Sequence, residues 1–237
     1  IGQAKTQQFL SDFAYPVDSN RDMLVVVATE LYNFGGHTKV IEDMVLHHQG
    51  PSMIILTDLY GSYSNGSLSI EEIQEKFPIN TSIFITPAIF LHRKVDYIIN
   101  LLLTLRPRNI VIAAHHDDVV AYASANASVN ANHIFLHHAD HNPSLGSTVG
   151  HYRHVDVSIN VKNICSDILA KQTEYLPLYV DDMGVKTFLN GTDNFSTVTS
   201  GSQAKFFSHG ATLYCEFIEA LASNIPGKHY HIGPIPD

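Results

Sequence analysis

One apolar run near the N-terminus constrains the fold of this chain more than any other segment. Residues 23–29 read MLVVVAT, without a polar side chain before the final threonine. A continuous β-branched run of this kind predicts a strand that is buried on both faces of a parallel sheet. A turn containing Gly35 and Gly36 follows, and apolar residues then recur at helical spacing from His37 to about His48. This segment therefore predicts a strand, a glycine-rich turn and a helix.

The same alternation continues over the first three quarters of the chain. Further strands are predicted at residues 52–57, 82–85, 109–113, 134–136 and 154–161. Helices are predicted at residues 69–77, 89–105 and 119–127, and another follows the strand at 154–161 and runs to about residue 170. A last apolar stretch lies around residues 175–180. Strands and helices that alternate with connections of this length imply parallel crossovers. The predicted fold class is therefore α/β, with a doubly wound, Rossmann-like parallel sheet.

A second unit is predicted after a polar stretch at residues 190–194, which has the composition of an interdomain linker. It comprises a strand at 195–199, a glycine-containing turn at 200–205, a helix at 211–222 and a strand at 228–232. We expect an N-terminal Rossmann-like domain over residues 1–190 and the beginning of a second one over residues 191–237. Because this second pattern stops early, we expect the chain to be part of a longer protein.

Composition and charge exclude several classes of function. Lysine and arginine number 14 against 23 acidic residues, the formal charge is −9, and no basic stripe is present, so nucleic acid is not an expected partner. No apolar run approaches the roughly 20 residues that span a bilayer. Cys165 and Cys215 lie far apart without a C-x-x-C motif, which argues against a disulfide scaffold or a zinc ribbon. A reducing, cytoplasmic setting is expected.

Two of the predicted strands are followed directly by histidine and aspartate. The strand at 109–113 precedes His115, His116, Asp117 and Asp118, and the strand at 134–136 precedes His137, His138, Asp140 and His141. Ligands of open α/β sheets bind at the carboxyl ends of strands. If the two strands are neighbours, we expect His115, His116, His138 and His141 to face one cleft. The alternative is that these are surface histidines of a histidine-rich chain.

The turn after the first strand is a second candidate site. Glycine has no Cβ, so the backbone N–H groups at Gly35 and Gly36 can approach an anion at the start of the following helix. The alternative is that these glycines only allow tight packing between strand and helix.

These motifs together resemble the glycosyltransferases of the GT-B type. The resemblance rests on the Gly-Gly-His turn at 35–37, the His-Ala-Asp-His loop at 138–141, and a second unit that opens with SGSQAKF and runs into HYHIGPIPD. It implies two Rossmann-like domains, of which the N-terminal one receives a carbohydrate or other hydroxyl acceptor and the C-terminal one binds a nucleotide-sugar donor. The remainder of the C-terminal domain is then an expected partner, and the chain alone is expected to be inactive.

The resemblance also assigns roles to individual residues. It implies that His138 or His141 reaches the transferred sugar, and that Gly35, Gly36 and His37 lie near the donor diphosphate or the acceptor. Gly201 and Lys205 stand where relatives contact the donor phosphates, and loss of Lys205 is expected to weaken donor binding. Histidine, with a reference pKa of about 6.5, can take a proton from a hydroxyl near neutral pH. No metal or other cofactor is implied, and we expect no tightly bound zinc or other transition metal at the histidine clusters that follow the strands at 109–113 and 134–136.

Two other functions fit the same residues. The sequence from Ala114 to Asp118 resembles the His-Pro-Asp-Asp signature of zinc-dependent sugar deacetylases, with His116 in place of proline, and His137, His138, Asp140 and His141 could supply further ligands. This motif follows a strand in the middle of the chain, whereas in the deacetylases it follows the first strand. A noncatalytic carbohydrate-binding α/β domain is the remaining alternative.

Overall fold

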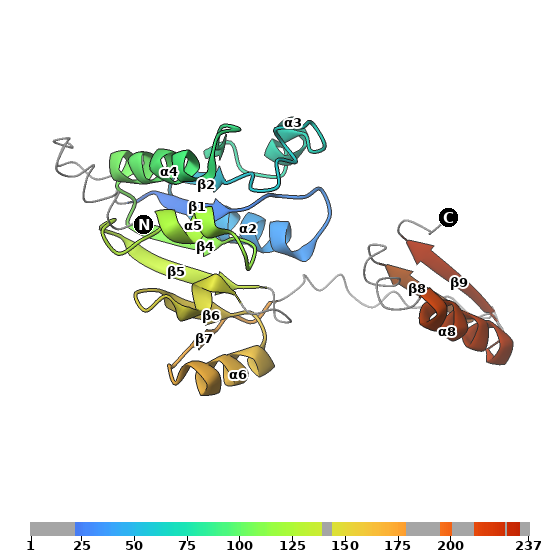
Figure 1. Ribbon diagram of the computed structural model, residues 1–237. Coiled ribbons are helices and arrows are strands. Elements are labelled where there is room, and N and C mark those ends of the chain that lie inside the picture. The colour runs from blue at the N-terminus through green and yellow to red at the C-terminus, as the bar shows by residue number, and fades with distance from the viewer. Residues whose placement is uncertain (1–21, 139–143, 179–194, 201–210, 226, 233–237) are drawn as a thin grey trace. The chain divides into compact units, whose positions relative to one another are not determined.

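The computed structural model describes residues 22–138, 144–178, 195–200, 211–225 and 227–232. The chain divides into two compact units, Ile1–Val180 and Asp181–Asp237 (Figure 1). The boundary predicted between residues 190 and 191 falls within residues 179–194, outside the described part of the chain.

The first unit alternates strands with helices. Its elements are β1 (Leu24–Ala28), α2 (Gly36–His47), β2 (Ser52–Leu56), α3 (Ile70–Gln74), β3 (Thr81–Ile85), α4 (Leu91–Leu105), β4 (Asn109–Ala113), α5 (Val119–Ser124), β5 (Asn132–His137), the 3-10 helix η1 (Leu145–Thr148), β6 (Arg153–Asp156), α6 (Ile159–Leu169) and β7 (Glu174–Tyr175). The helix with the clearest predicted apolar stripe, α4, is also the longest of these.

The seven strands form one sheet in the order β3-β2-β1-β4-β5-β6-β7, and every neighbouring pair is parallel. The predicted Rossmann-like parallel α/β sheet is therefore confirmed. β1 lies between β2 and β4, so the chain builds one half of the sheet outward from β1, returns, and builds the other half from β4. A reversal of this kind is a topological switch point, where the connections after the two central strands separate.

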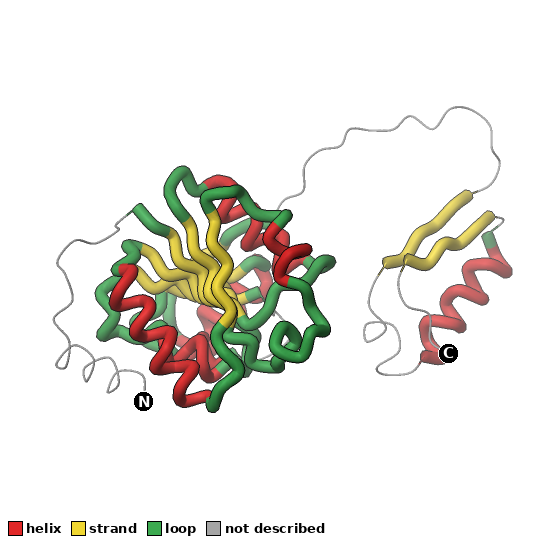
Figure 2. Tube along the Cα trace, turned by 90° about the horizontal axis from the view of Figure 1, so that it is seen from above, coloured by secondary structure: helices red, strands yellow, loops and turns green. Residues whose placement is uncertain are grey.

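The sheet is buried on both faces, which explains the unbroken apolar run of β1. Alternate residues of β1 enter different cores: Val25 and Val27 pack with α4 and α5, whereas Leu24, Val26 and Ala28 pack with α2 and α3. The strands lie side by side with helices around them (Figure 2). The parallel sheet thus holds the carboxyl ends of β1 and β4 as a rigid platform.

The prediction of a strand over residues 154–161 is wrong at its C-terminal end. β6 ends at Asp156, and α6 begins at Ile159 after Ser158, whose φ of −130° and ψ of 135° are still extended. The β-branched residues there mimic a strand in sequence, but the neighbouring β7 pairs only with Val155 and Asp156. Of the described residues in the apolar stretch around 175–180, namely 175–178, Tyr175 lies in a strand, at the end of β7.

The second unit contains one parallel strand pair joined through a helix. β8 (Phe195–Ser200) pairs in parallel with β9 (Gly227–Ile232), and α8 (Ala211–Asn224) lies between them in sequence. These two strands form a sheet of their own, separate from the seven-stranded one. Among the described residues, none of the helices combines the length and apolar character needed to cross a membrane.

Candidate functional site at the switch point

The carboxyl ends of β1 and β4 are tied together by one buried carboxylate. Oδ2 of Asp118 accepts hydrogen bonds from the hydroxyls of Thr29 (2.7 Å) and Thr57 (2.6 Å), and Oδ1 accepts from the backbone N–H groups of Val120 and Ala121 (both 3.0 Å). The residue is fully buried and is the N-cap of α5. Asp118 thus joins the ends of β1, β2 and β4 to the start of α5.

Three imidazoles gather above this platform. His37 stacks on His138 with ring centroids 4.2 Å apart, and His115 lies 6.1 Å from His37 and 6.3 Å from His138. They come from the first turn of α2, the end of β4 and the end of β5. Because β4 and β5 are neighbours in the sheet, His115 and His138 lie together as the sequence predicts. We call these three residues the imidazole cluster.

His37 is held in one tautomer. Its Nε2 lies 2.6 Å from the carbonyl oxygen of Ala113, the last residue of β4, and a carbonyl can only accept. Nε2 therefore carries the proton. Nδ1 is an unprotonated nitrogen that is buried and has no hydrogen-bond partner among the described residues. This contact fixes the start of α2 against the end of β4.

His115 belongs to a chain of hydrogen bonds that defines its tautomer as well. The single hydroxyl hydrogen of Tyr60 is donated to Oδ1 of Asp117 at 2.7 Å. The hydroxyl oxygen of Tyr60 lies 3.3 Å from Nδ1 of His115 and can only accept there, so Nδ1 carries the proton. The remaining ring nitrogen, Nε2, then has a free lone pair. An Asp117–Tyr60–His115 chain of this kind presents a base.

The imidazole cluster is electrically neutral at pH 7. Burial, and next the proximity of His138, lowers the pKa of His37 to about 3. Burial lowers the pKa of His138 to about 4. The pKa of His115 is also lowered, chiefly by burial, although the charges of Glu30, Asp117 and Asp118 oppose that shift. All three rings are therefore hydrogen-bonding groups rather than cations near neutral pH.

The start of α2 forms the border of the cluster. Gly35 is the N-cap with φ 147° and ψ 146°, and no side chain caps the helix. Gly35 and Gly36 are exposed, and a Cβ on either would meet nothing within 4 Å. Since no atom packs closely against the glycines, tight packing between strand and helix does not explain them, whereas the open surface leaves their backbone accessible. Gly35 is required by its backbone conformation rather than by space.

The two glycines are expected to respond in opposite directions to alanine. Gly35→Ala forces a non-glycine residue to a positive φ and should destabilise the protein by about 1–3 kcal/mol. Gly36→Ala adds a helix-favouring residue within α2 and should stabilise it by up to about 1 kcal/mol. The shift of the urea midpoint followed by circular dichroism measures both effects, and equal shifts would contradict this account of the turn.

An open hollow of about 640 Å³ lies next to the cluster. Tyr60 lines this hollow together with Phe90, Arg93 and Lys94, and Phe90 is 79% exposed. The Lys94 ammonium is buried and donates to the carbonyl oxygens of Thr57 (2.6 Å) and Asp58 (2.8 Å). Tyr60 thus forms one wall of the hollow and also contacts His115.

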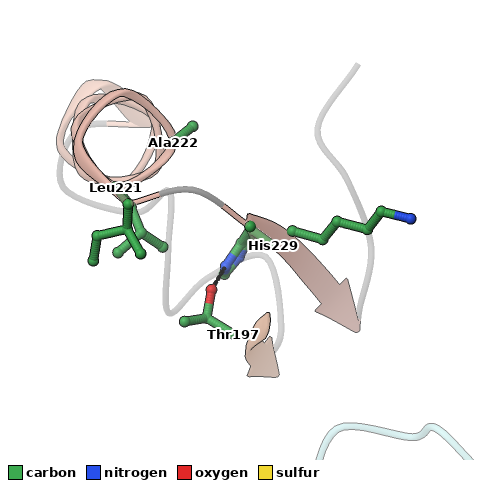
Figure 3. A pocket seen from close by; sticks show the side chains of 7 residues that line it. Thr197, Leu221, Ala222 and His229 are labelled. Atoms are coloured by element: carbon green, nitrogen blue, oxygen red, sulfur yellow. Dashed lines mark hydrogen bonds between the residues drawn. The ribbon is translucent and has the colours of Figure 1, made fainter. Parts of the chain in front are cut away.

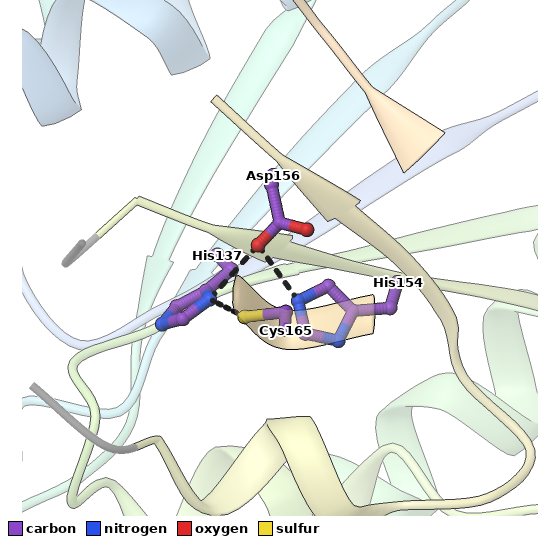
Figure 4. A group of neighbouring side chains, drawn as sticks. All are labelled: His137, His154, Asp156 and Cys165. Carbon is purple, nitrogen blue, oxygen red and sulfur yellow. Dashed lines mark hydrogen bonds and ion pairs between the residues drawn. The ribbon is translucent and has the colours of Figure 1, made fainter. Parts of the chain in front are cut away.

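A separate cluster of four buried side chains lies between β5, β6 and α6 (Figure 4). Oδ1 of Asp156 is 3.0 Å from Nδ1 of His137 and 3.0 Å from Nε2 of His154, and Sγ of Cys165 is 3.5 Å from the same Nδ1 of His137. We call these four residues the buried tetrad. Within the described part of the chain, these four side chains are grouped closely enough to hold a metal ion, with their ligand atoms within 4.8 Å of one another.

The Ala114–Asp118 segment does not offer a comparable metal site. Both oxygens of Asp118 are already occupied by four hydrogen bonds, and Asp117 accepts from Tyr60. A metal ion would have to displace contacts that hold the central strands together. This geometry does not favour the deacetylase alternative.

The second unit contains a small cavity of about 30 Å³ between α8 and the two strands (Figure 3). Thr197, Leu221, Ala222 and His229 are among its lining residues, and Oγ1 of Thr197 lies 2.8 Å from Nδ1 of His229. This volume has room for roughly one or two water molecules and not for a sugar. Of the other predicted site residues, His141, Gly201 and Lys205 lie outside the described residues.

The sequence does not single out several residues that the structure brings to these sites. Tyr60 lies 55 positions from His115 in the chain, and its hydroxyl contact depends on a loop conformation that no pattern encodes. The buried tetrad draws its members from three elements, β5, β6 and α6, and of these members only His137 is a candidate ligand in the sequence analysis. The sequence signal that could have indicated the tetrad is the presence of polar residues at strand positions, namely His137, His154 and Asp156.

No model of a known protein family matches this chain, and no curated protein matches its sequence closely enough to be counted as a relative.

Proposed function

We propose that this protein is a glycosyltransferase of the GT-B type, in which the imidazole cluster activates a hydroxyl group of a carbohydrate or other acceptor. The observation that carries the proposal is the Asp117–Tyr60–His115 chain at the switch point of the sheet. These hydrogen bonds leave Nε2 of the neutral His115 ring unprotonated, at the edge of the sheet where ligands of parallel α/β proteins bind.

In the proposed reaction, the acceptor hydroxyl donates a hydrogen bond to Nε2 of His115. Its oxygen forms a bond to the anomeric carbon of the donor sugar while the bond from that carbon to the diphosphate oxygen breaks. Nε2 takes the hydroxyl proton, and the imidazolium is stabilised by Tyr60 and, through it, by Asp117. The electron pair of the broken bond leaves with the nucleoside diphosphate, and His115 returns its proton to solvent.

The surroundings of His115 support a polar, ring-shaped acceptor. The hollow beside it is lined by the exposed aromatic ring of Phe90 and by Tyr60, and it carries Arg93 at its edge. An aromatic face offers apolar contact to the C–H face of a sugar ring, while the neutral imidazoles offer hydrogen bonds to its hydroxyl groups. We assign this hollow to the acceptor.

The remaining predicted residues keep the roles implied by the resemblance. His138, stacked on His37, and His141 are proposed to contact the transferred sugar, and Gly35, Gly36 and His37 to lie near the donor diphosphate or the acceptor. Gly201 and Lys205 are proposed to bind the donor phosphates. Losing the charge-assisted hydrogen bond of Lys205 would weaken nucleotide-sugar binding by roughly tenfold to a hundredfold.

Tyr60→Phe tests the hydrogen-bond chain without removing the aromatic wall of the hollow. The substitution deletes the acceptor of the Nδ1–H of His115, so turnover should fall roughly 2- to 10-fold, the equivalent of one neutral hydrogen bond. Tyr97→Phe is the matched control, because Tyr97 stacks on Phe84 of β3, outside the imidazole cluster. The steady-state rate of nucleoside diphosphate release measures both variants.

If Tyr60 positions His115, the Tyr60→Phe substitution should change kcat and its pH dependence. The fall should appear in kcat, with the donor affinity unchanged, and the acid limb of the pH profile should move because the partner of His115 has changed. If Tyr60→Phe and Tyr97→Phe give the same rates and the same pH profile, the hydrogen bonds of Asp117 and Tyr60 do not assist His115 as the base.

A further inference from the structure

The buried tetrad is unusual because it places polar groups in a packed interior. The exposed fractions are 5% for His137, 2% for His154, 0% for Asp156 and 8% for Cys165. One candidate ligand atom from each residue lies within 4.8 Å of all the others. Three further polar atoms of the tetrad are buried without a hydrogen-bond partner among the described residues: Nε2 of His137, Nδ1 of His154 and Oδ2 of Asp156.

We propose that His137, His154, Asp156 and Cys165 bind one zinc ion in a closed structural site. Two imidazole nitrogens, one carboxylate oxygen and one thiolate sulfur are the ligand types of protein-bound zinc, and four protein ligands complete a tetrahedron. All four side chains are buried, so the site has no open position for a substrate. The role of the ion is therefore structural.

The distances support this assignment. Zinc bonds of about 2.0–2.3 Å in a tetrahedron place the ligand atoms roughly 3.3–3.8 Å apart. The contacts of Asp156 with the two imidazoles are 3.0 Å, and the contact of Cys165 with His137 is 3.5 Å. All four ligand atoms lie within 4.8 Å of one another, so the two 3.0 Å contacts need to lengthen by a few tenths of an ångström and the more distant pairs need to close by up to about 1 Å to admit the ion.

Charge balance points in the same direction. The tetrad places the carboxyl group of Asp156 in the protein interior, where a charged group is costly unless a positive charge or hydrogen bonds compensate it. Lys171 is the nearby cation, but its ammonium donates to the carbonyl oxygen of Tyr152 at 2.7 Å. A Zn²⁺ ion with one carboxylate and one thiolate is neutral, and the displaced thiol proton leaves to solvent.

The histidine tautomers limit how tightly the ion can be held. When Nδ1 of His137 and Nε2 of His154 bind the metal, the opposite nitrogens carry the protons, and neither has an acceptor among the described residues. Outer hydrogen bonds of this kind contribute roughly 10- to 100-fold to metal affinity. We therefore expect zinc binding weaker by about that factor than in a site with complete outer hydrogen bonds.

This site is independent of the proposed sugar transfer. None of its four members belongs to the imidazole cluster or lines the hollow beside Tyr60. The proposal departs from the expectation of no transition metal at the histidine clusters at one residue, His137, whereas His115 and His138 are not among the proposed ligands.

The test is the metal content and the cobalt spectrum of the whole chain. Protein kept under a thiol reductant is equilibrated with ZnCl₂, passed through a desalting column and analysed by mass spectrometry for bound zinc. A second sample is loaded with Co²⁺, whose visible bands report tetrahedral geometry and whose near-ultraviolet charge-transfer band reports a thiolate ligand. We expect about one zinc per chain and both spectral features.

Cys165→Ser and Cys215→Ser are matched variants, since each removes one of the two free cysteines and only the first belongs to the tetrad. Cys215→Ser should retain the zinc and the cobalt–thiolate band, whereas Cys165→Ser should lose the band and most of the zinc. His154→Gln should also lose the zinc while circular dichroism shows the fold intact.

The proposal is overturned if the unmodified chain binds no zinc under these conditions, or if its cobalt spectrum lacks the thiolate band. It is also overturned if Cys165→Ser holds as much zinc as Cys215→Ser. Should Cys165→Ser fail to fold, the spectrum of the unmodified chain decides alone, because it does not depend on any variant.

Discussion

His115→Ala should lower the turnover of the sugar-transfer reaction by about 10²- to 10⁴-fold, the usual contribution of a general base. The expected change is in kcat, because His115 acts on the acceptor hydroxyl and not on the donor phosphates. The side chain is only partly buried, and the backbone N–H of His115 keeps its 2.8 Å hydrogen bond to Oγ1 of Thr29. The fold should therefore survive the substitution.

The pH dependence of turnover is expected to follow the protonation of the His115 imidazole. Burial lowers the pKa of His115 from its ordinary value, and the base works in its neutral form. Activity should therefore persist as the pH falls through about 6.5, the reference value of imidazole, and should be lost only below the lowered pKa. An acid limb above pH 6.5 would contradict the assignment of His115 as the base.

His92→Ala is the matched control for this experiment. His92 is an exposed histidine of α4 whose ring stacks on Phe90 and belongs to neither cluster. Its loss should change kcat by less than twofold. Parallel measurements of kcat and donor affinity for His115→Ala and His92→Ala separate a specific loss at the cluster from a general effect of deleting an imidazole.

Asp118→Ala is expected to produce the largest loss of stability among single substitutions at the switch point. It removes the N-cap of α5 and leaves two buried hydroxyls, on Thr29 and Thr57, without their acceptor. A lost cap costs about 0.5–2 kcal/mol, and each unsatisfied buried group costs about 1–3 kcal/mol. The free energy of unfolding should therefore fall by about 2.5–8 kcal/mol.

The neighbouring carboxylate provides the control. Asp117 is exposed, so Asp117→Ala should change the free energy of unfolding by less than about 0.5 kcal/mol. Urea titrations followed by far-ultraviolet circular dichroism suit this chain, which contains no tryptophan. Equal midpoints for Asp117→Ala and Asp118→Ala would show that Asp118 does not join the central strands.

Most of the first unit could be predicted because each buried strand is encoded by a local apolar run. The pattern at residues 109–113 coincides with β4, and the run at residues 23–29 contains β1. The end of β6 could not be predicted in this way. Its limit depends on where β7 pairs, which is a contact between segments rather than a property of either one.

The candidate site was predictable only in part for the same reason. Histidines after β4 and β5 could be placed near each other once the two strands were assumed to be neighbours. The tautomer of His37 depends on the carbonyl of Ala113, and that of His115 on Tyr60, so neither follows from spacing. Asp118 was singled out as a possible metal ligand, whereas its four hydrogen bonds give it a structural role.

The central claim is that His115, at the switch point of the sheet, activates a hydroxyl group for sugar transfer. The most direct measurement incubates the protein with a panel of nucleotide-sugars and mixed carbohydrate acceptors, and detects products by mass spectrometry. We predict an acceptor that gains the mass of one sugar residue together with release of nucleoside diphosphate, and loss of both with His115→Ala. Unchanged product formation by His115→Ala, or no consumption of any nucleotide-sugar, would contradict the claim.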